Sequence, residues 1–303
     1  MRHIPVLLKE TVEALNLKPG AKVVDCTLGD AGHSEEILRR ISPGGKLLGL
    51  DADEESLERA KNFLKLYQKQ ITLVRTNFAH VTEVANAEGF NEVDAILMDL
   101  GWSTPQFEER GRGFSFEGSE PLDMRYDTHS KSKTAAEILN NYSKAELEKI
   151  FRQYAEEKFS KEIAEKIGEK RKTQVFETTK DLTDTVLDVY RAKLKSTKEI
   201  PWIGGIHPAT KVFQSLRIEV NQELEVLKKT IPELINLLKV GGRLGIITFH
   251  SLEDRIVKQF FKKIEHKKIK FVFKKPLIAS SEELKANPRS RSAKLRVVEK
   301  ISN

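Results

Sequence analysis

Apolar residues along the first hundred positions follow two alternating patterns. Short continuous apolar runs, which predict buried strands, lie at residues 21–27, 46–50, 71–75 and 93–100. Between these runs the apolar residues recur at helical spacing, as Ile37, Leu38 and Ile41 do before a helix-stopping Ser-Pro-Gly-Gly. Strands that alternate with helices of this length predict βαβ units, and therefore a parallel sheet with helices on both faces.

The pattern changes after the fourth predicted strand. Residues 101–130 are rich in glycine, charge and aromatic side chains and have no periodicity, so we expect a long ordered loop or a lid there. Residues 133–194 have helical spacing throughout, with a capping box at Ser143 and a further helix cap at Thr179. Residues 195–208 are typical of a linker that leads back to the sheet.

Strand-like sequence returns near the end of the chain. A leucine-rich helix is expected after residue 222, kinked or split at Pro232. A glycine turn then leads into a strand at residues 244–249, and residues 295–299 can supply a last edge strand.

These patterns predict an α/β fold with two domains. Residues 1–107 and 206–303 would form one discontinuous sheet domain with helices on both faces. Residues 108–205 would form the lid loop and an inserted all-helical domain, which we expect to recognise the substrate.

Composition narrows the classes of protein further. The 303 residues include one cysteine, Cys26, which excludes an internal disulfide and a multi-thiolate zinc site. No apolar run is long enough for a membrane span, so we expect a soluble, cytoplasmic protein with no membrane partner. No cluster of metal ligands is recognisable in the sequence, so no metal is predicted, and a site assembled from distant carboxylates stays open as an alternative.

Charge is unevenly distributed along the chain. Residues 255–303 hold 15 Lys and Arg against 4 Asp and Glu, whereas the remainder holds 37 against 41. A basic block at the end of a slightly acidic chain suggests a polyanionic partner, with nucleic acid first. The alternative is a solvated tail.

The loop after the first strand, residues 25–33, lies where an open α/β sheet binds ligands. A dinucleotide site requires three glycines, and this loop has two, together with Asp25 and Asp30. Two carboxylates would repel a pyrophosphate but attract a sulfonium and an amino group, so the loop suits S-adenosylmethionine better than a nicotinamide cofactor. Asp51, at the end of the second strand, is expected to bind both ribose hydroxyls, whereas Asp53 is interpreted as a helix cap.

Two further strands also end in residues that can do chemistry. Asp99 ends the fourth strand and could accept a hydrogen from an exocyclic amine that is being methylated, or could cap a turn. His250 ends a later strand and is either catalytic or a hydrogen-bonded structural histidine, with Ser251 and Asp254 beside it as a capping box. Trp102 could stack on a base or line the lid.

Longer strings identify a family. The chain closely resembles the ribosomal-RNA small-subunit methyltransferase H family, also called MraW, from residue 3 to residue 296. The strings that carry this resemblance are HIPVLLKE, DCTLGDAGHS, LGLDAD, DLGWSTPQ, RGFSF, PLDMRYD, YAEE, HPATKVFQSLRIEVNQEL, GGRLGIITFHSLEDRIVK and NPRSRSAKLR. The resemblance implies a class I, Rossmann-like methyltransferase domain with a helical insertion. It also implies that S-adenosylmethionine methylates the exocyclic amino group of one cytidine in the decoding region of 16S rRNA.

The resemblance also assigns roles to particular residues. The family's cofactor contacts fall on Ala31, Gly32, His33, Asp51, Phe78, Asp99 and Gln106. The chain departs from the family pattern at Asp30 and Ala31, where glycines are usual, and at Trp102, Tyr126 and Ala155. The alanine at 31 raises the question of where its methyl group lies, because the backbone should approach the cofactor there.

The sequence leaves several alternatives open. A nicotinamide-dependent oxidoreductase and a non-catalytic RNA-binding assembly factor are the rival functions. The substrate would be free rRNA, a precursor or the 30S subunit, and a homodimer is one candidate assembly. In the basic block, Arg289, Arg291 and Lys294 are expected to contact phosphates without reading the base sequence.

Overall fold

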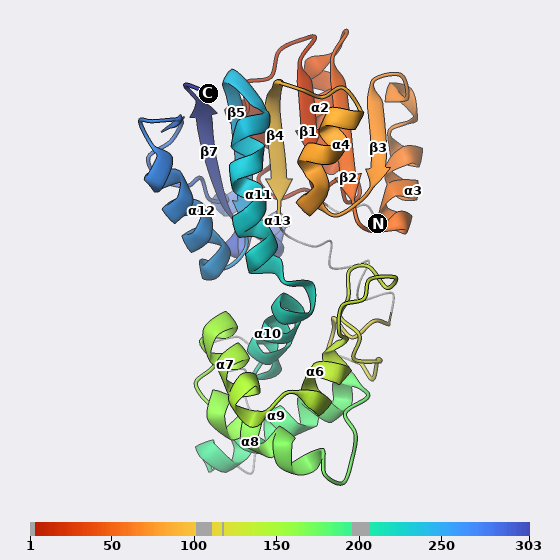
Figure 1. Cartoon of the computed structure of the whole chain (residues 1–303), viewed down its shortest axis with the longest axis vertical. Coiled ribbons are helices and arrows are strands. Elements are labelled where there is room, and N and C mark those ends of the chain that lie inside the picture. The colour runs from red at the N-terminus through yellow and green to blue at the C-terminus, as the bar shows by residue number, and fades with distance from the viewer. Residues whose placement is uncertain (1–3, 101–110, 117, 196–206) are drawn as a thin grey trace. The chain divides into compact units, whose positions relative to one another are not determined.

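The computed structural model describes residues 4–100, 111–116, 118–195 and 207–303. The chain divides into two compact units. One unit comprises residues 1–103 and 224–303 and contains the sheet, and the other comprises residues 104–223 and is helical. Figure 1 labels their elements.

The sheet unit has seven strands in the order β3-β2-β1-β4-β5-β7-β6. The strands are β1 Lys22–Asp25, β2 Lys46–Asp51, β3 Ile71–Arg75, β4 Val93–Asp99, β5 Leu238–Thr248, β6 Ile269–Phe271 and β7 Lys294–Lys300. Strands β1 to β5 are parallel to one another, and β7 runs antiparallel to both β5 and β6. This architecture confirms the predicted α/β sheet, with one difference. The strand expected at the edge, β7, is internal, because the short β6 pairs with its outer side.

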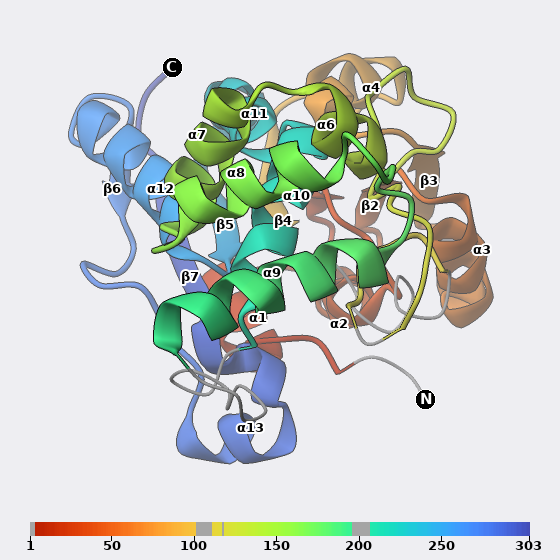
Figure 2. The same ribbon diagram turned by 90° about the horizontal axis from the view of Figure 1, so that it is seen from below.

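The sheet is covered on both faces because consecutive residues in the middle of its central strands are apolar and buried. Val23, Leu47 and Ala95 pack into one core, with helices α1 Leu8–Ala14, α2 Gly32–Ile41 and α3 Glu54–Phe63. Their immediate neighbours in sequence, Val24, Leu48 and Ile96, pack into the other core. That second core contains residues of α4 Val81–Ala87, α11 Glu223–Leu237 and α12 Ser251–Ile264. Figure 2 shows α1 and α2 on one side of the strands and α4 and α11 on the other. Consecutive strand residues thus pack into opposite cores, as the two-residue period of a strand buried on both sides requires.

Short elements complete the sheet unit. Three 3₁₀ turns lie at Lys65–Tyr67 (η1), Phe78–His80 (η2) and Pro288–Ser292 (η3), and a six-residue helix, α13, spans Ser281–Ala286. Helix α11 runs unbroken through Pro232, so of the two predicted alternatives, a kink or a split, the split is wrong. Neither α1 nor α13 was predicted from the apolar pattern.

The helical unit contains α6 Ala135–Asn141, α7 Lys144–Ala155, α8 Ser160–Lys170, α9 Thr179–Leu194 and α10 Ala209–Asn221. Capping boxes start α6 at Thr134, α7 at Ser143 and α9 at Thr178. The predicted box at Ser143 is therefore confirmed, whereas the cap of α9 is Thr178, one residue before the predicted Thr179. Helix α10 packs on α6, α7 and α9, so the helical unit extends to residue 223 and the sheet resumes later than the predicted residue 206.

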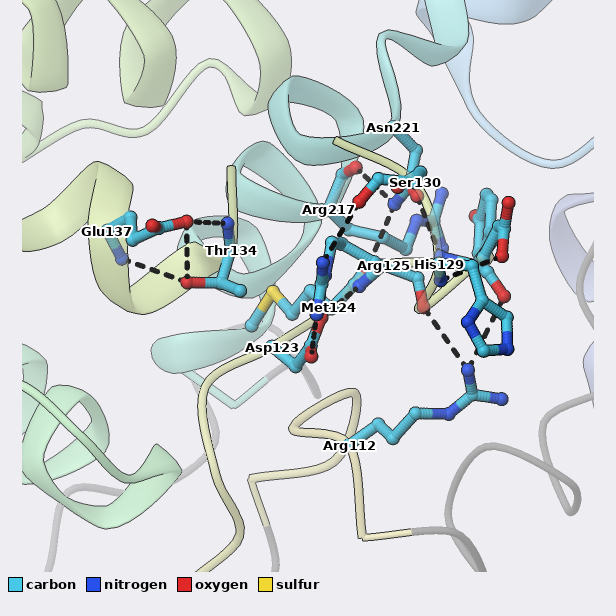
Figure 3. Close-up of polar contacts among 12 residues, drawn as sticks. Arg112, Asp123, Met124, Arg125, His129, Ser130, Thr134, Glu137, Arg217 and Asn221 are labelled. Carbon is cyan, nitrogen blue, oxygen red and sulfur yellow. Dashed lines mark hydrogen bonds and ion pairs between the residues drawn. The ribbon is translucent and has the colours of Figure 1, made fainter. Parts of the chain in front are cut away.

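One polar cluster ties the loop before α6 to α10 (Figure 3). The Asn221 amide donates to the carbonyl of Met124 at 2.8 Å, and its oxygen accepts the backbone N–H of Tyr126 at 2.9 Å. Met124 has a left-handed backbone, with φ of 61°, which a non-glycine residue adopts at a cost. The Tyr126 hydroxyl donates to Glu223, which also accepts two hydrogen bonds from Arg217.

The same loop is stiffened by an ion pair. Arg125 donates two hydrogen bonds to Asp123, at 2.7 and 2.8 Å. Burial alone would raise the pKa of Asp123, but hydrogen bonds and charge from Arg125 outweigh burial and lower it. The Arg112 guanidinium lies 3.4 Å from the carbonyls of Arg125 and Tyr126. The tyrosine that departs from the family pattern thus has a defined hydroxyl partner in this cluster.

Replacing Asn221 tests how much this cluster stabilises the helical unit. Asn221→Ala leaves the Met124 carbonyl and the Tyr126 amide without their partners, so we expect the free energy of unfolding to fall by about 1–3 kcal/mol. Urea denaturation measures the loss. The matched control is Asn141→Ala, because Asn141 is exposed and bonds only its own helix. Equal losses in the two variants would contradict the assignment.

Candidate active site

Parallel pairing brings three carboxylates to one edge of the sheet. Asp25, Asp51 and Asp99 are the last residues of β1, β2 and β4, and β1 lies between the other two strands. In the parallel register Asp25 is opposite Leu97 and Gly49, two residues before the ends of the neighbouring strands. The carboxyl ends of adjacent parallel strands are the usual ligand-binding edge of an open α/β sheet.

The loop from β1 to α2 has two residues in the left-handed region. Gly29 has φ of 50° and Ala31 has φ of 59°, and the Ala31 amide donates to the Leu28 carbonyl at 2.8 Å. The Ala31 side chain is fully buried in the core that contains α2 and α3. Its methyl group therefore packs inward, which answers the question raised by the missing glycine.

Two of the carboxylates expected beside the cofactor have protein partners instead. Asp25 is 1 % exposed, and it accepts hydrogen bonds from the Ser34 hydroxyl at 2.7 Å and the Thr27 amide at 3.1 Å. Burial raises the pKa of Asp25. Asp30 accepts a hydrogen bond from the Arg59 guanidinium at 2.9 Å. Asp25 therefore fixes the loop and Asp30 is paired with Arg59. That the two carboxylates attract the positive end of a cofactor stays a prediction.

Asp51 is placed as the sequence predicted. One carboxylate oxygen accepts the Gly29 amide at 2.8 Å, and the other accepts the Asp53 amide at 2.9 Å. Each oxygen has a second lone pair, so the carboxylate can also accept two ribose hydroxyls. Burial raises the pKa of Asp51 to about 6, and the two backbone hydrogen bonds only partly oppose that effect. Asp53 caps α3 through the Ser56 amide, as predicted.

Asp99 and His33 come together at the edge. The Asp99 amide donates to the Thr27 hydroxyl at 2.6 Å, and the Asp99 carboxylate lies 3.7 Å from His33 Nδ1. The Asp99 side chain is 17 % exposed, compared with 8 % for His33. The other ring nitrogen of His33, Nε2, is 3.0 Å from the Val6 carbonyl. A carbonyl only accepts, so Nε2 carries a hydrogen and Nδ1 faces the carboxylate.

The remaining residues predicted to contact cofactor or substrate are Phe78, Gln106 and Trp102. Phe78 lies in η2 just after β3, half-buried against the apolar core, so its ring is close to the same edge. Trp102 and Gln106 lie outside the described residues.

His250 has a local structural role. It is the N-cap of α12, where its Nδ1 accepts the Glu253 amide at 3.4 Å. The Glu253 carboxylate in turn accepts the Phe249 amide at 2.8 Å and lies 3.1 Å from His250 Nε2. The capping box therefore begins at His250, one residue before the predicted Ser251. Asp254 instead binds Arg296 at 2.7 Å. These contacts favour the structural alternative for His250.

The three basic residues expected to bind phosphate lie in and just after η3. Arg289 and Arg291 are exposed, and Ser290 between them is 1 % exposed. Lys294 opens β7 opposite Thr248, the last residue of β5, and is 3.6 Å from Asp254. The β5–β7 pairing therefore places η3 near the carboxyl edge, where the prediction requires it.

Comparison with known proteins identifies the family. The model of the MraW methylase family matches residues 1–301. The chain belongs to the MraW methylase family. It is 44 % identical to the ribosomal RNA small subunit methyltransferase H of Symbiobacterium thermophilum, over 99 % of this chain and 96 % of that protein.

Solved structures are more distant from this methylase. An rRNA methylase from Streptococcus thermophilus is 12 % identical, with a TM-score of 0.45, covering 100 % of this chain and 99 % of that one. NSun6 from Pyrococcus horikoshii, solved with SFG, is 12 % identical, with a TM-score of 0.48, covering 100 % and 53 %.

The residues at the edge fit S-adenosylmethionine, the cofactor of this methylase class. Asp51 has free lone pairs for a ribose, and Asp99 is a partly exposed carboxylate suited to a cationic group. The Phe78 ring is available to pack on adenine. Family membership also disfavours the rival nicotinamide-dependent oxidoreductase.

The raised pKa of Asp51 predicts a pH dependence of cofactor binding. Ribose hydroxyls donate to the ionised carboxylate, so affinity should fall as pH drops through about 6, where Asp51 gains a proton. Calorimetry with S-adenosylhomocysteine from pH 7.5 to 5 measures this. In Asp51→Asn, binding at pH 7.5 should weaken by about 1–3 kcal/mol and lose the step near pH 6. A step that persists in the variant would assign it to another group.

Proposed function

We propose that this chain transfers a methyl group from S-adenosylmethionine to the exocyclic amino group of one cytidine in the decoding region of small-subunit rRNA. The observation that carries the proposal is the 44 % identity, over nearly both full lengths, to a small-subunit rRNA methyltransferase. The substrate is the rRNA or the 30S subunit. The cytoplasm is the expected location, and no helix in the described part of the chain is long and apolar enough to cross a membrane.

The reaction needs an acceptor for an amine hydrogen. S-adenosylmethionine supplies an electrophilic methyl group on a sulfonium. The amine of cytidine is a weak nucleophile because its lone pair is delocalised into the ring. Asp99 lies at the edge and can accept a hydrogen bond from that amine, which helps the nitrogen to become pyramidal as the nitrogen–carbon bond forms. The amine gives up one proton, which the Asp99 carboxylate is placed to accept, and the bound cofactor would keep the electron pair of the sulfur–carbon bond that breaks.

Positioning accounts for much of the remaining catalysis. Two bound reactants held in line can contribute up to about 7–11 kcal/mol through lost translational and rotational freedom. The Thr27 hydroxyl and the β4–β5 pairing hold the backbone of Asp99, and the His33 ring lies beside its carboxylate. We assign His250 a structural role rather than a role in the chemistry, because its ring caps α12.

The basic block supports an RNA substrate. Besides the three predicted phosphate contacts, α12 carries Lys258, Lys262 and Lys263 at exposed positions. The buried side of the same helix is apolar, with Val257 and Phe261 in the core. This amphipathic, basic surface fits a phosphate backbone better than it fits a disordered tail.

Asp99→Asn tests the catalytic assignment. The variant keeps the size of the side chain but weakens its ability to accept a proton, so methyl transfer should slow by about 10²–10⁴-fold while RNA affinity is unchanged. Tritium transfer into small-subunit rRNA gives the rate, and mass spectrometry of the nucleosides gives the modified base. Asp94→Asn, at the start of β4, is the control. An unaltered rate in Asp99→Asn would reject the role of Asp99, and RNA binding by the wild type without transfer would favour the assembly-factor alternative.

The salt dependence of RNA binding tests the phosphate contacts. Replacing Arg289, Arg291 and Lys294 by alanine should reduce the slope of log affinity against log salt by about 0.7 for each lost contact. A matched variant removes three exposed lysines from the segment that leads into β3, the edge strand at the other end of the strand order. These are Lys61, Lys65 and Lys69. Equal slopes in the two variants would indicate that Arg289, Arg291 and Lys294 are solvated and do not contact phosphate.

A further inference from the structure

The segment Ile4–Leu7, called here the N-terminal strap, lies against the cofactor loop. Pro5 occupies the space beside Gly32 so closely that a Cβ on Gly32 would lie 2.2 Å from its ring. The carbonyl of Val6 is the partner of His33 Nε2, at 3.0 Å. Val6 is 2 % exposed and Leu7 is fully buried. The strap is therefore packed into the sheet unit, although it lies almost at the start of the chain.

Two residues far along the chain, Glu283 and Asn287, form hydrogen bonds with the other side of the strap. The backbone N–H of Leu7 donates to the Glu283 carboxylate at 2.7 Å, and the Asn287 side-chain amide donates to the Ile4 carbonyl at 3.1 Å. Asn287 is 6 % exposed. Leu7 has φ of 54°, a left-handed conformation that leucine adopts only when its surroundings impose it. Both ends of the strap are thus fixed by the α13–η3 segment.

These contacts control the orientation of the His33 ring. The Val6 carbonyl requires a hydrogen on Nε2, and this contact turns Nδ1 toward the Asp99 carboxylate, 3.7 Å away. If the strap moved, the ring would lose its fixed partner, and Gly32 would lose the proline packed on it. A loop that must be ordered during binding binds more weakly than one that is already ordered.

We propose that Asn287 and Glu283 are positioning residues for cofactor binding, which they support by holding the strap against Gly32 and His33. The inference rests on the proposed function for the identity of the cofactor and for the phosphate contacts of Arg289 and Arg291. It adds a second role for the basic end of the chain, because Arg289 and Arg291 follow Asn287 directly. One short segment then contacts RNA phosphate with its exposed arginines and orders the cofactor loop with its buried asparagine.

Asn287→Asp is the primary test. It keeps the size of the side chain but replaces the donor to Ile4 with a second oxygen, so the dissociation constant of S-adenosylhomocysteine, measured by calorimetry, should rise about tenfold, the equivalent of one hydrogen bond. Hydrogen exchange of the cofactor-free protein should become faster at residues 25–34 and stay unchanged in α3. The control is Asn62→Asp, an exposed position on α3.

Further variants separate positioning from a general loss of folding. Glu283→Gln keeps an acceptor for the Leu7 amide and should bind cofactor nearly as the wild type does, whereas Glu283→Ala should not. Pro5→Ala should also weaken binding, and its effect should not add fully to that of Asn287→Asp, because both act through the strap. Fully additive effects of the two substitutions on cofactor binding would contradict the inference that both act through the strap.

The outcomes distinguish the two proposals. If the wild type does not bind S-adenosylhomocysteine, the proposed function fails. If the wild type binds and Asn287→Asp matches Asn62→Asp in affinity and in exchange at residues 25–34, this inference is overturned. Faster exchange throughout the sheet unit in Asn287→Asp would likewise reject a positioning role in favour of a purely structural one.

Discussion

The parallel pairing of β1 with β2 and β4 is the constraint on which the rest of the site depends. It brings three aspartates to one edge of the sheet. Like charges so close together destabilise one another unless each carboxylate has its own stabilising environment. Asp25 is buried among hydroxyl and amide donors. Asp51 binds two backbone amides and has a raised pKa. Asp99 keeps partial exposure beside an imidazole. We therefore propose different tasks for the three carboxylates: to fix the loop, to bind a ribose and to face the substrate.

Periodicity predicted the sheet because its strands are continuous apolar runs. The same reasoning found Asp51 and Asp99, because a carboxylate at the end of a buried strand stands out in the sequence. It did not predict the protein partners of Asp25 and Asp30, since the side to which a loop carboxylate turns depends on distant partners such as Arg59. It also missed β6, which has only three residues and no apolar run of its own.

Contacts between segments that are far apart in the sequence are the features that could not be predicted. The shift of the α12 capping box from Ser251 to His250 could have been found, because Glu253 lies three residues after His250 in the required spacing. The strap offered no such signal. Val6 and Leu7 have the same apolar character as many helix residues, and only the folded chain shows that a carbonyl at position 6 meets a histidine at position 33. The domain boundary at residue 223 likewise follows from the packing of α10, which its own sequence does not reveal.

The long reach of the strap has a consequence for biosynthesis. Its hydrogen bonds to Glu283 and Asn287 span 276 and 283 residues of sequence. A ribosome makes the strap long before its two anchors, so the β1–α2 loop is without this support while the residues between them are synthesised. The order of synthesis thus delays the full support of this loop until residues 283 and 287 have been made. A chain cut short before residue 283 would lack both anchors.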